Sequence, residues 1–272
     1  MKKTILLVLV FFSCFACTSR REKPHPDATD VPAITIMSYN VHVGKGMDNI
    51  VSLERIRDDI QKAGADLIGI QEMDRFTKRN PVDQPAALAK ISGFHFTFSK
   101  NIDYQEGEYG IAILSRHPIL EKRALHYKQR DERESRGALA VKVHPDSPSF
   151  SKPIWFVTTH LGTDASGEEQ KNQVRELLDW MKEFEEQGCL IVTGDMNQTP
   201  ITPAIELFTT DFVDLWLEAG RDEGYTFNAI EPSKRIDYIF IRKKDLHSCA
   251  KAFVPESVAS DHRPVVAEVL LK

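Results

Sequence analysis

The segment Leu190-Ile191-Val192-Thr193-Gly194-Asp195-Met196-Asn197 carries two features from which the architecture can be inferred. Its first part is an apolar run bounded by a turn signal, which is typical of a strand buried on both faces. Gly194 lets the backbone turn tightly, and Asp195 and Asn197, being alternate residues, then point the same way. The pattern predicts a buried strand whose end presents an acid and an amide. The alternative is an Asx turn without a chemical role.

Along the rest of the chain, predicted strands first alternate with predicted helices and then follow one another in a run of strands. This arrangement predicts a layered α/β fold with mixed sheets. A helix is expected from Ser52 as N-cap to Gly64, and a short helix over 85–91. The longest helix is expected to begin at Ser166, with Glu169 completing a capping box, and to end at Gly188. The other expected strands span residues 34–41, 67–71, 94–98, 110–114, 138–143, 154–159, 236–241 and 265–270.

The N-terminus has the pattern of an export signal. Two lysines precede the apolar run Ile5–Phe12, which is too short to cross a bilayer core of about 30 Å as a helix. Cys14 or Cys17 would be the lipidated residue of a bacterial lipoprotein, and Ala16-Cys17 is the more lipobox-like end. Ordinary secretion with full removal of the signal is the alternative.

These observations predict the domain organisation. Residues 1–17 form the export signal, 18–31 a polar linker with two prolines, and 32–272 one domain. The protein is expected to be a monomer in a bacterial cell envelope, anchored to a membrane on the periplasmic or surface side, or else secreted.

Charge limits the partners. The chain has 35 basic and 40 acidic residues, and removal of Lys2 and Lys3 leaves 33 against 40, a net charge of −7. The longest basic run is residues 242–244, whereas a generic polyanion binder shows a basic face. A local groove could still be positive, so nucleic acid is disfavoured without being excluded. Cys189 and Cys249 are predicted to be small core residues, with a disulfide as the alternative.

Three polar side chains stand where predicted strands end. Asn40 closes the first strand, Glu72 follows the second, and His160 follows strand 154–159. A carboxylate at such an edge is a hard oxygen ligand suited to Mg²⁺, which keeps several waters and needs one or two protein carboxylates. The alternatives are a turn residue, a solvent-exposed or capping acid, and a hydrogen-bonded structural histidine.

Two further motifs flank the last strands. Arg235-Ile236-Asp237-Tyr238 enters one apolar strand, and Ser260-Asp261-His262-Arg263-Pro264 precedes the other. A buried acid at the start of a strand needs a partner, because an unpaired buried charge costs several kcal/mol. A histidine beside an acid is the usual unit of general acid–base work, and its reference pKa of about 6.5 lies near working pH.

Together these motifs resemble the endonuclease/exonuclease/phosphatase superfamily, which includes deoxyribonuclease I, apurinic endonucleases, neutral sphingomyelinases and inositol polyphosphate 5-phosphatases. The similar pieces occur in the family's order and cover Ile34 to Leu270. They are Ser38-Tyr39-Asn40, Gln71-Glu72, Tyr109-Gly110 through Leu114-Ser115-Arg116, Thr159-His160-Leu161, Gly194-Asp195-Met196-Asn197, Arg235-Ile236-Asp237-Tyr238 and Ser260-Asp261-His262-Arg263-Pro264.

The resemblance implies a deoxyribonuclease I-like four-layer α/β/β/α sandwich with the site at one edge. It implies that Glu72 is the principal ligand of Mg²⁺, or of Mn²⁺, with Asn40 beside it. Asp261 would give a second metal contact. Asn40 would also touch the substrate.

The resemblance also implies roles for the remaining residues. Asp195 and Asn197 would orient the attacking water and a phosphate oxygen. His262, held by Asp237, would act as general base or phosphate contact. His160 would stabilise the pentacovalent phosphorus or protonate the leaving oxygen.

Two positions refine this resemblance. Arg136 stands where relatives carry an arginine that faces the phosphate, which makes it a candidate substrate-binding residue. His42 stands where apurinic endonucleases carry an Asp, two residues after the first-strand Asn, so an apurinic specificity is not expected.

The expected function is metal-dependent hydrolysis of a phosphoester, in the first place a phosphodiester, by attack of water on phosphorus. A small or lipid-linked substrate is favoured, because the acidic loop 101–108 would repel a long polyanion if it lined the site. A secreted nuclease acting on DNA or RNA is one alternative, and a non-catalytic binding module is another.

Overall fold

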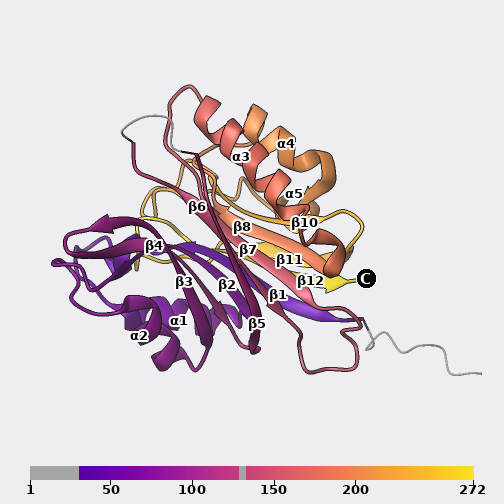
Figure 1. Ribbon diagram of the computed structural model, residues 1–272, viewed down its shortest axis with the longest axis horizontal. Coiled ribbons are helices and arrows are strands. Elements are labelled where there is room, and N and C mark those ends of the chain that lie inside the picture. Colours follow the sequence, from indigo (N-terminus) through magenta and orange to yellow (C-terminus); the bar gives the residue numbers. More distant parts are fainter. Residues whose placement is uncertain (1–30, 129–132) are drawn as a thin grey trace, which may run out of the picture. The chain divides into compact units, whose positions relative to one another are not determined.

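Two six-stranded mixed sheets pack face to face in the computed structural model, which describes residues 31–128 and 133–272 (Figure 1). The first sheet has the order β11-β12-β1-β2-β4-β3 and the second β5-β6-β7-β8-β10-β9. The strands of the first sheet are β1 Ala33–Asn40, β2 Leu67–Arg75, β3 His95–Tyr104, β4 Gly107–Ser115, β11 Leu246–Phe253 and β12 Val265–Leu271. Those of the second are β5 Ile119–His126, β6 Gly137–Val143, β7 Ile154–His160, β8 Cys189–Asp195, β9 Phe212–Asp214 and β10 Asp237–Arg242.

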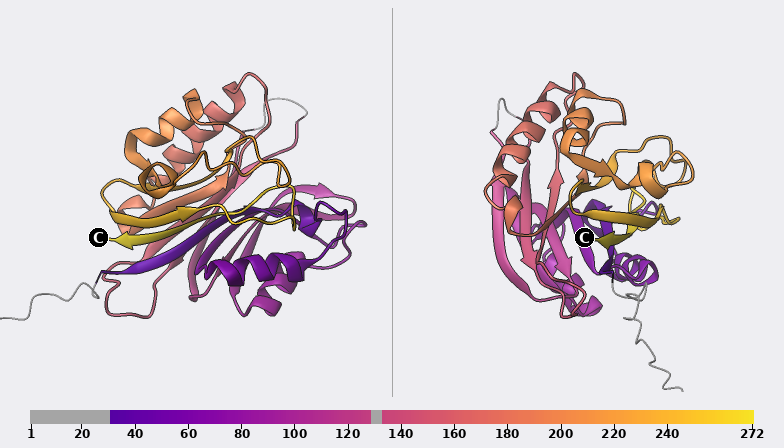
Figure 2. Two further views of the ribbon diagram at one scale, coloured as in Figure 1. Left: turned by 180° about the vertical axis from the view of Figure 1, so that it is seen from behind. Right: turned by 90° about the vertical axis from the view of Figure 1, so that its right-hand side faces the viewer.

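Helices cover the outer face of each sheet. Helices α1 (Leu53–Ala63) and α2 (Gln84–Ser92) lie along the first sheet, and α3 (Glu168–Met181) and α4 (Pro203–Asp211) along the second (Figure 2). The short α5 (Leu215–Ala219) packs against β10 and β11. One apolar cluster lies between the sheets and one lies under each helical layer. The predicted four-layer α/β/β/α sandwich is therefore confirmed.

The register of the strands brings distant parts of the chain to one end of the sandwich. Strands β1 and β2 are parallel, with Asn40 beside Gln71. Strands β7 and β8 are also parallel and end together, with His160 beside Asp195, while the antiparallel β10 begins there with Asp237. Carboxyl ends of parallel strands thus meet the amino ends of antiparallel ones, and the polar residues that follow the strands collect at this end, here called the site end.

Most local predictions are confirmed. Ser52 caps α1, where its side chain accepts a hydrogen bond from the Arg55 amide, and Gly64 ends the helix in the left-handed conformation. Helix α2 ends at Gly93 in the same way. The predicted strands all exist, although β3 extends six residues beyond its expected end at Phe98.

The capping box predicted at Ser166 is wrong. Helix α3 begins at Glu168, after Gly167, whose φ of +75° is left-handed and which has no side chain to cap the helix. The Ser166 hydroxyl donates to Asp164 instead. Glu169 turns away to Arg133 and Gln173, because an ion pair and a side-chain bond are available there. The helix also ends at Met181, before the expected Gly188.

Several elements had no sequence-based prediction. Strand β5 lies at the edge of its sheet and alternates half-buried and exposed residues, and β11 is an irregular edge strand with two register shifts. Helices α4 and α5, strand β9 and the single 3-10 turns η1 (His42–Gly44) and η2 (Glu185–Gln187) complete the set. Edge strands contact one neighbour only, so their apolar pattern is weak.

Cys189 and Cys249 are both free thiols, so the disulfide alternative is wrong. Cys189 is buried between the sheets, and Cys249 is partly buried at the edge of the same cluster. The predicted export signal, either lipidated cysteine and nearly all of the linker lie outside the described residues. In the described part of the chain, no helix has the length and apolar character needed to cross a bilayer.

Candidate active site

Asp195 lies at the centre of the site end. It closes β8, and its side chain is almost completely buried. Its Oδ1 accepts the amide of Asn197 at 2.9 Å, and its Oδ2 accepts Nδ2 of Asn40 at 3.0 Å. Burial and the charge of Asp237 raise the pKa of Asp195 to about 7, against the opposing effects of His262 and of these two donors. Asp195 is thus a carboxyl group that exchanges a proton near neutral pH.

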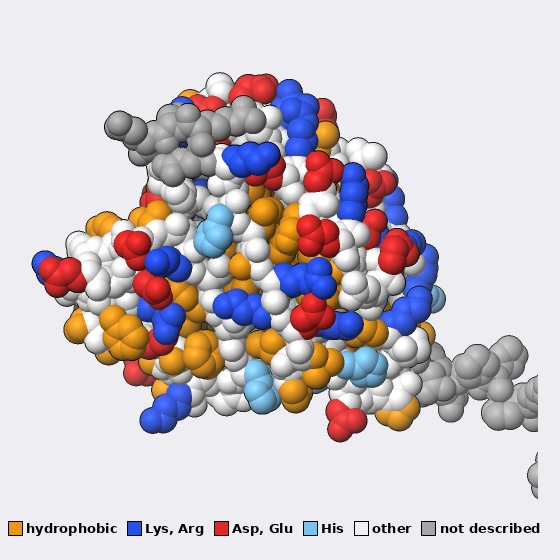
Figure 3. All heavy atoms as spheres, viewed as in Figure 1, with side chains coloured by type: hydrophobic (Ala, Val, Ile, Leu, Met, Phe, Trp, Pro, Cys, Tyr) orange, Lys and Arg blue, Asp and Glu red, His pale blue; other side chains and the backbone are white. Residues whose placement is uncertain are grey.

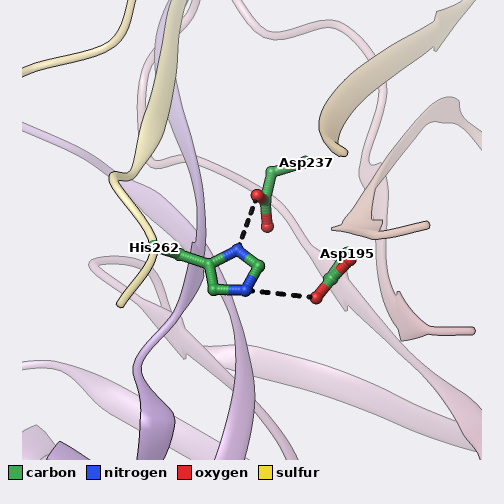
Figure 4. A group of neighbouring side chains, drawn as sticks. All are labelled: Asp195, Asp237 and His262. Atoms are coloured by element: carbon green, nitrogen blue, oxygen red, sulfur yellow. Dashed lines mark hydrogen bonds and ion pairs between the residues drawn. The ribbon is translucent and has the colours of Figure 1, made fainter. Parts of the chain in front are cut away.

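The His262 ring lies between two carboxylates (Figure 4). Its Nδ1 is 2.8 Å from Oδ2 of Asp237, and its Nε2 is 3.7 Å from Oδ2 of Asp195. Burial lowers the pKa of His262, but the charges of Asp237 and Asp195 outweigh it and raise the pKa to about 10. His262 is therefore an imidazolium at neutral pH. Thr226 donates to the same oxygen of Asp237 at 2.6 Å and fixes that carboxylate.

His160 lies on the other side of Asp195, at the end of β7. Its Nε2 is 3.4 Å from Oδ2 of Asp195, and its Nδ1 is 2.9 Å from Nη1 of Arg136. Burial, the guanidinium of Arg136 and the charge of His262 lower the pKa of His160 well below its ordinary value. His160 is a neutral imidazole in this environment.

The tautomer of His160 follows from its neighbours. A guanidinium only donates, so Nδ1 of His160 is the acceptor and the proton lies on Nε2. This N–H points toward Asp195. Asn197 approaches Nε2 at 3.2 Å, but its amide nitrogen also donates to the Leu161 carbonyl at 3.1 Å, and that bond sets its orientation.

Glu72 and Asn40 form the third part of the site. Glu72 lies inside β2 rather than after it, at a bulge between Ile70 and Met73, and has a φ of +62°. The bulge turns the carboxylate toward β1, where Nδ2 of Asn40 donates to it at 3.0 Å. Asn40 thereby bridges Glu72 and Asp195. Its Oδ1 accepts the amide of His42 at 3.1 Å, which fixes the orientation of the amide group.

These contacts show where a divalent cation would fit. Glu72 is half-buried and accepts one hydrogen bond from protein, so its carboxylate can take a hard cation that keeps part of its water shell. Asp195, Asp237 and His262 also place ligand atoms within 4.8 Å of one another. A cation there would have to displace the 2.8 Å bond between His262 and Asp237. The donor set at Glu72 is therefore the better fit.

The structure brings together nearly all the residues predicted for the site. Asn40, His160, Asp195, Asn197, Asp237, His262, Arg136 and Glu72 are linked by direct contacts. Asp261 differs, because its carboxylate lies 3.5 Å from Nδ1 of His42 and no contact joins it to Glu72. Asn40 presents its amide nitrogen, which does not bind metals, to the two carboxylates. The metal roles of Asn40 and Asp261 stay predictions.

Sequence reasoning assigned no role to two residues of the site. Tyr109 is buried beside Arg136, with which it shares a hydrogen bond, and burial followed by the charge of Glu72 raises its pKa. It belongs to the motif Tyr109-Gly110, which was a usable signal. Thr226, which fixes Asp237, lies in a long loop without a pattern, so no signal existed for it.

A cleft of about 330 Å³ opens beside His262. It is lined by side chains of mixed character from the loops after β7 and β8 and before β10, among them Asn197, Phe227 and Lys234. The ring of Phe227 lies 4.9 Å from that of His262, centroid to centroid. The cleft gives a small molecule access to the imidazolium.

Known proteins are similar to this chain in sequence or in fold. The uncharacterized protein YbhP of Escherichia coli K12 is 27% identical over 263 residues, which cover 90% of this chain and all of YbhP. Among solved structures, the mannosyl-6-phosphatase of Bacteroides thetaiotaomicron aligns with a TM-score of 0.73 at 19% identity, covering 87% of this chain and 99% of that one. The human Nocturnin catalytic domain, solved with a bound sulfate anion, aligns with a TM-score of 0.68 at 19% identity, covering 89% and 94%.

Residues 37–262 match the family model described as Endonuclease/Exonuclease/phosphatase family, whose members are generally hydrolases of phosphoester bonds. The match covers most of the chain and includes every residue of the candidate active site. This protein belongs to the Endonuclease/Exonuclease/phosphatase family.

Proposed function

We propose that this protein is a divalent-metal-dependent hydrolase that cleaves a phosphoester of a small or lipid-linked molecule by direct attack of water on phosphorus. The observation that supports this most strongly is the imidazolium of His262, which lies between Asp237 and Asp195 and faces the cleft. A fixed buried cation beside a carboxyl group of near-neutral pKa suits a reaction that gathers negative charge on phosphate oxygens.

His262 and Asp195 have different roles, one as a donor to the phosphate and the other as the base. The Nε2–H of the cationic His262 donates to a phosphate oxygen, and Asp237 holds the ring in place. Asp195 accepts the proton of the attacking water, because its raised pKa makes it a better base than an ordinary carboxylate at neutral pH.

His160 contributes a neutral hydrogen bond. Arg136 keeps the proton of His160 on Nε2, so this N–H donates to a phosphate oxygen or to the leaving oxygen in the transition state. Because His160 stays neutral, it does not transfer a full proton as an acid.

The metal would be held by Glu72, with water completing its shell. When bound there, it supplies positive charge to the phosphate and lowers the pKa of a coordinated water. Mg²⁺ is the first choice, because the donors are oxygen atoms and one or two carboxylates suffice. Mn²⁺ accepts the same donors.

Surface composition supports the substrate class. In the described part of the chain, eight of the twelve exposed large hydrophobic residues lie on loops at the site end. They are Ile50, Val51, Phe76, Val82, Ile201, Tyr225, Ile230 and Val258. Hydrophobic side chains also lie at the surface of this end in Figure 3. Loops of this character suit an amphiphilic substrate better than a duplex of nucleic acid.

The acidic segment 101–108 was expected to repel a long polyanion if it lined the site. The segment 101–108 is not a free acidic loop but the hairpin of β3 and β4, and its acids are paired. Lys100 contacts Asp103 at 2.8 Å, Lys78 contacts Glu106 at 2.6 Å, and Arg75 contacts Glu108 at 3.0 Å. The hairpin therefore does not repel a polyanion strongly, and a nuclease stays the alternative function.

A panel of substrates tests the proposal. The purified protein is incubated with an aryl phosphomonoester, an aryl phosphodiester, phosphatidylinositol, sphingomyelin, duplex DNA and RNA, each with Mg²⁺, with Mn²⁺ and with EDTA. We expect hydrolysis of a small or lipid phosphoester that EDTA abolishes. Cleavage of nucleic acid at protein levels that leave the others intact would make the protein a nuclease. No turnover of any substrate would favour a binding module.

The cellular setting is part of the proposal. We place the domain beside a bacterial membrane as a monomer anchored through Cys17 or Cys14, because a lipid-linked substrate would be met there. Labelling of cells with a radioactive fatty acid tests the anchor, and a Cys17→Ser variant that still carries label would move the anchor to Cys14.

A further inference from the structure

A second cationic group lies next to the site, in the loop that joins β2 to α2. Residues 76–82 fold around Asp74, which is fully buried. The carboxylate of Asp74 accepts from Thr77 at 2.9 Å, from Asn80 at 2.8 Å and from Arg79. So many donors on one buried acid hold the loop, and with it Arg79, in one conformation.

The Arg79 guanidinium is held along one edge and on one face. Its Nε donates to Oδ2 of Asp74 at 2.7 Å and its Nη2 to Oδ1 at 2.9 Å. The Arg79 Cζ atom lies 4.6 Å from the ring centroid of Tyr104 and 5.6 Å from the ring centroid of Tyr109. A guanidinium has five N–H donors, so Asp74 uses two and three remain, including the fork of Nη1 and Nη2.

The Arg79 side chain reaches the protein surface. It is 38% exposed although its partner is fully buried. Among the described residues, no acceptor bonds the free fork. A rigid fork of this kind suits two oxygens of a phosphate or carboxylate.

Tyr109 connects Arg79 to the site. The ring of Tyr109 lies against the Arg79 guanidinium, and the Tyr109 hydroxyl shares a hydrogen bond with Arg136. Arg136 in turn bonds His160. Glu72 and Arg79 both act on the pKa of Glu134, which burial and Glu72 raise and which Arg136 and Arg79 lower. Arg79 thus contacts Tyr109 on one side, and Tyr109 contacts Arg136 of the site on the other.

We propose that Arg79 binds a second anionic group of the substrate, a phosphate or carboxylate separate from the phosphoester that is cleaved. The inference deepens the proposed function, on which it depends for the position of the first phosphate. The substrate would then carry two anionic groups. Arg79 would select such compounds over simple monophosphates.

The competing explanation is that Arg79 only fastens the loop. Other bonds already do so, because the amide of Lys78 donates to the carbonyl of Gln105 at 3.0 Å and the amide of Arg79 donates to Oε1 of Gln105 at 3.0 Å. A fastening role also needs one edge of the guanidinium and leaves the fork unused.

Binding of matched anions separates the two explanations without requiring turnover. Alkanediol bisphosphates with two to five carbons and the alkyl monophosphates of equal length are titrated into the full-length protein by calorimetry. We expect one chain length of bisphosphate to bind about 10- to 100-fold more tightly than its monophosphate, as a charge-assisted bond predicts. In Arg79→Ala this preference disappears, and in Arg79→Lys it is reduced, because lysine keeps the charge and loses the fork.

Arg116 provides the matched control. It also pairs with an aspartate, Asp66, at 2.8 Å and also stacks on an aromatic ring, Phe94, at 5.1 Å, but at the opposite end of β4. Arg116→Ala should keep the full preference for bisphosphates. Equal affinity for both anions in the wild-type protein, or an equal loss of both in a folded Arg79→Lys variant, would overturn the proposal. A preserved preference in a protein without any hydrolytic activity would instead reject the proposed function and leave the Arg79 subsite standing.

Discussion

His160 and His262 approach the same oxygen of Asp195, at 3.4 and 3.7 Å, yet they carry different charges. Both rings are buried. His160 turns its Nδ1 to the guanidinium of Arg136, whereas His262 turns its Nδ1 to the carboxylate of Asp237. Burial lowers the pKa of both rings. At His262 the charges of Asp237 and Asp195 overcome this effect, whereas at His160 the guanidinium of Arg136 adds to it.

The difference means that one site presents two kinds of donor to a phosphate. His262 is a fixed cation, and His160 is a neutral N–H of defined tautomer. Such a division stabilises developing charge without placing two imidazolium groups side by side, which would repel each other in a buried site.

The largest effect is expected when the shared partner is removed. Asp195→Asn keeps the size of the side chain but cannot accept a proton, so we expect kcat to fall about 10²–10⁴-fold, as for loss of a general base. The amide nitrogen of Asn replaces one of the two oxygens that accept hydrogen bonds from Asn40 and Asn197, so the melting temperature is measured alongside kcat to show that the variant is folded. Turnover within twofold of wild type would remove Asp195 from the role proposed.

The two histidines should respond unequally to the same substitution. Glutamine can replace a neutral N–H donor but not a cation, so we expect His262→Gln to lower kcat/KM about 10²-fold more than His160→Gln, in line with the strength of charged over neutral hydrogen bonds. Both variants are measured on one substrate from the panel at one pH. Equal losses would show that the two rings do not differ in charge during the reaction.

The neutrality of His160 can be tested directly. In Arg136→Met the guanidinium is absent, so we expect the pKa of His160 to rise toward its ordinary value. Imidazole NMR signals followed over pH, without metal, report the pKa and the tautomer. Arg116→Met serves as control, because Arg116 has no contact with His160. An unchanged titration of His160 in Arg136→Met would leave burial and the charge of His262 as its causes.

The dependence of stability on pH reports the charge of His262. The pKa of His262 rises from about 6.5 to about 10 on folding, so the folded form binds the proton more tightly and gains stability from it. This gain is complete below pH 6.5 and is lost as the pH rises through 10. The free energy of unfolding of wild type minus that of His262→Gln, measured by urea denaturation in EDTA, should therefore shrink from pH 6 to pH 10. A difference that grows over this range would contradict the cationic state.

Much of the fold could be predicted because its central strands are continuous apolar runs and its first helices have clear caps. Ser52 and Gly64 mark α1 without reference to the rest of the chain. Prediction failed where tertiary contacts replaced the local contacts that the sequence indicated. Ser166 and Glu169 have the sequence of a capping box, but Ser166 bonds Asp164 and Glu169 pairs with Arg133. The bulge at Glu72 was also invisible, since it depends on pairing with β4.

The sequence by itself determined which chemically competent residues stand at strand ends, because apolar runs mark the strands and the polar residues that follow them have no role in the core. Only the tertiary structure decided what state those residues are in. Asn40 became a bridge between carboxylates, His262 a cation and His160 a neutral donor through contacts with residues up to 155 positions away in the chain. Protonation and orientation depend on the sum of all nearby charges and hydrogen bonds, and the folded chain alone sets these.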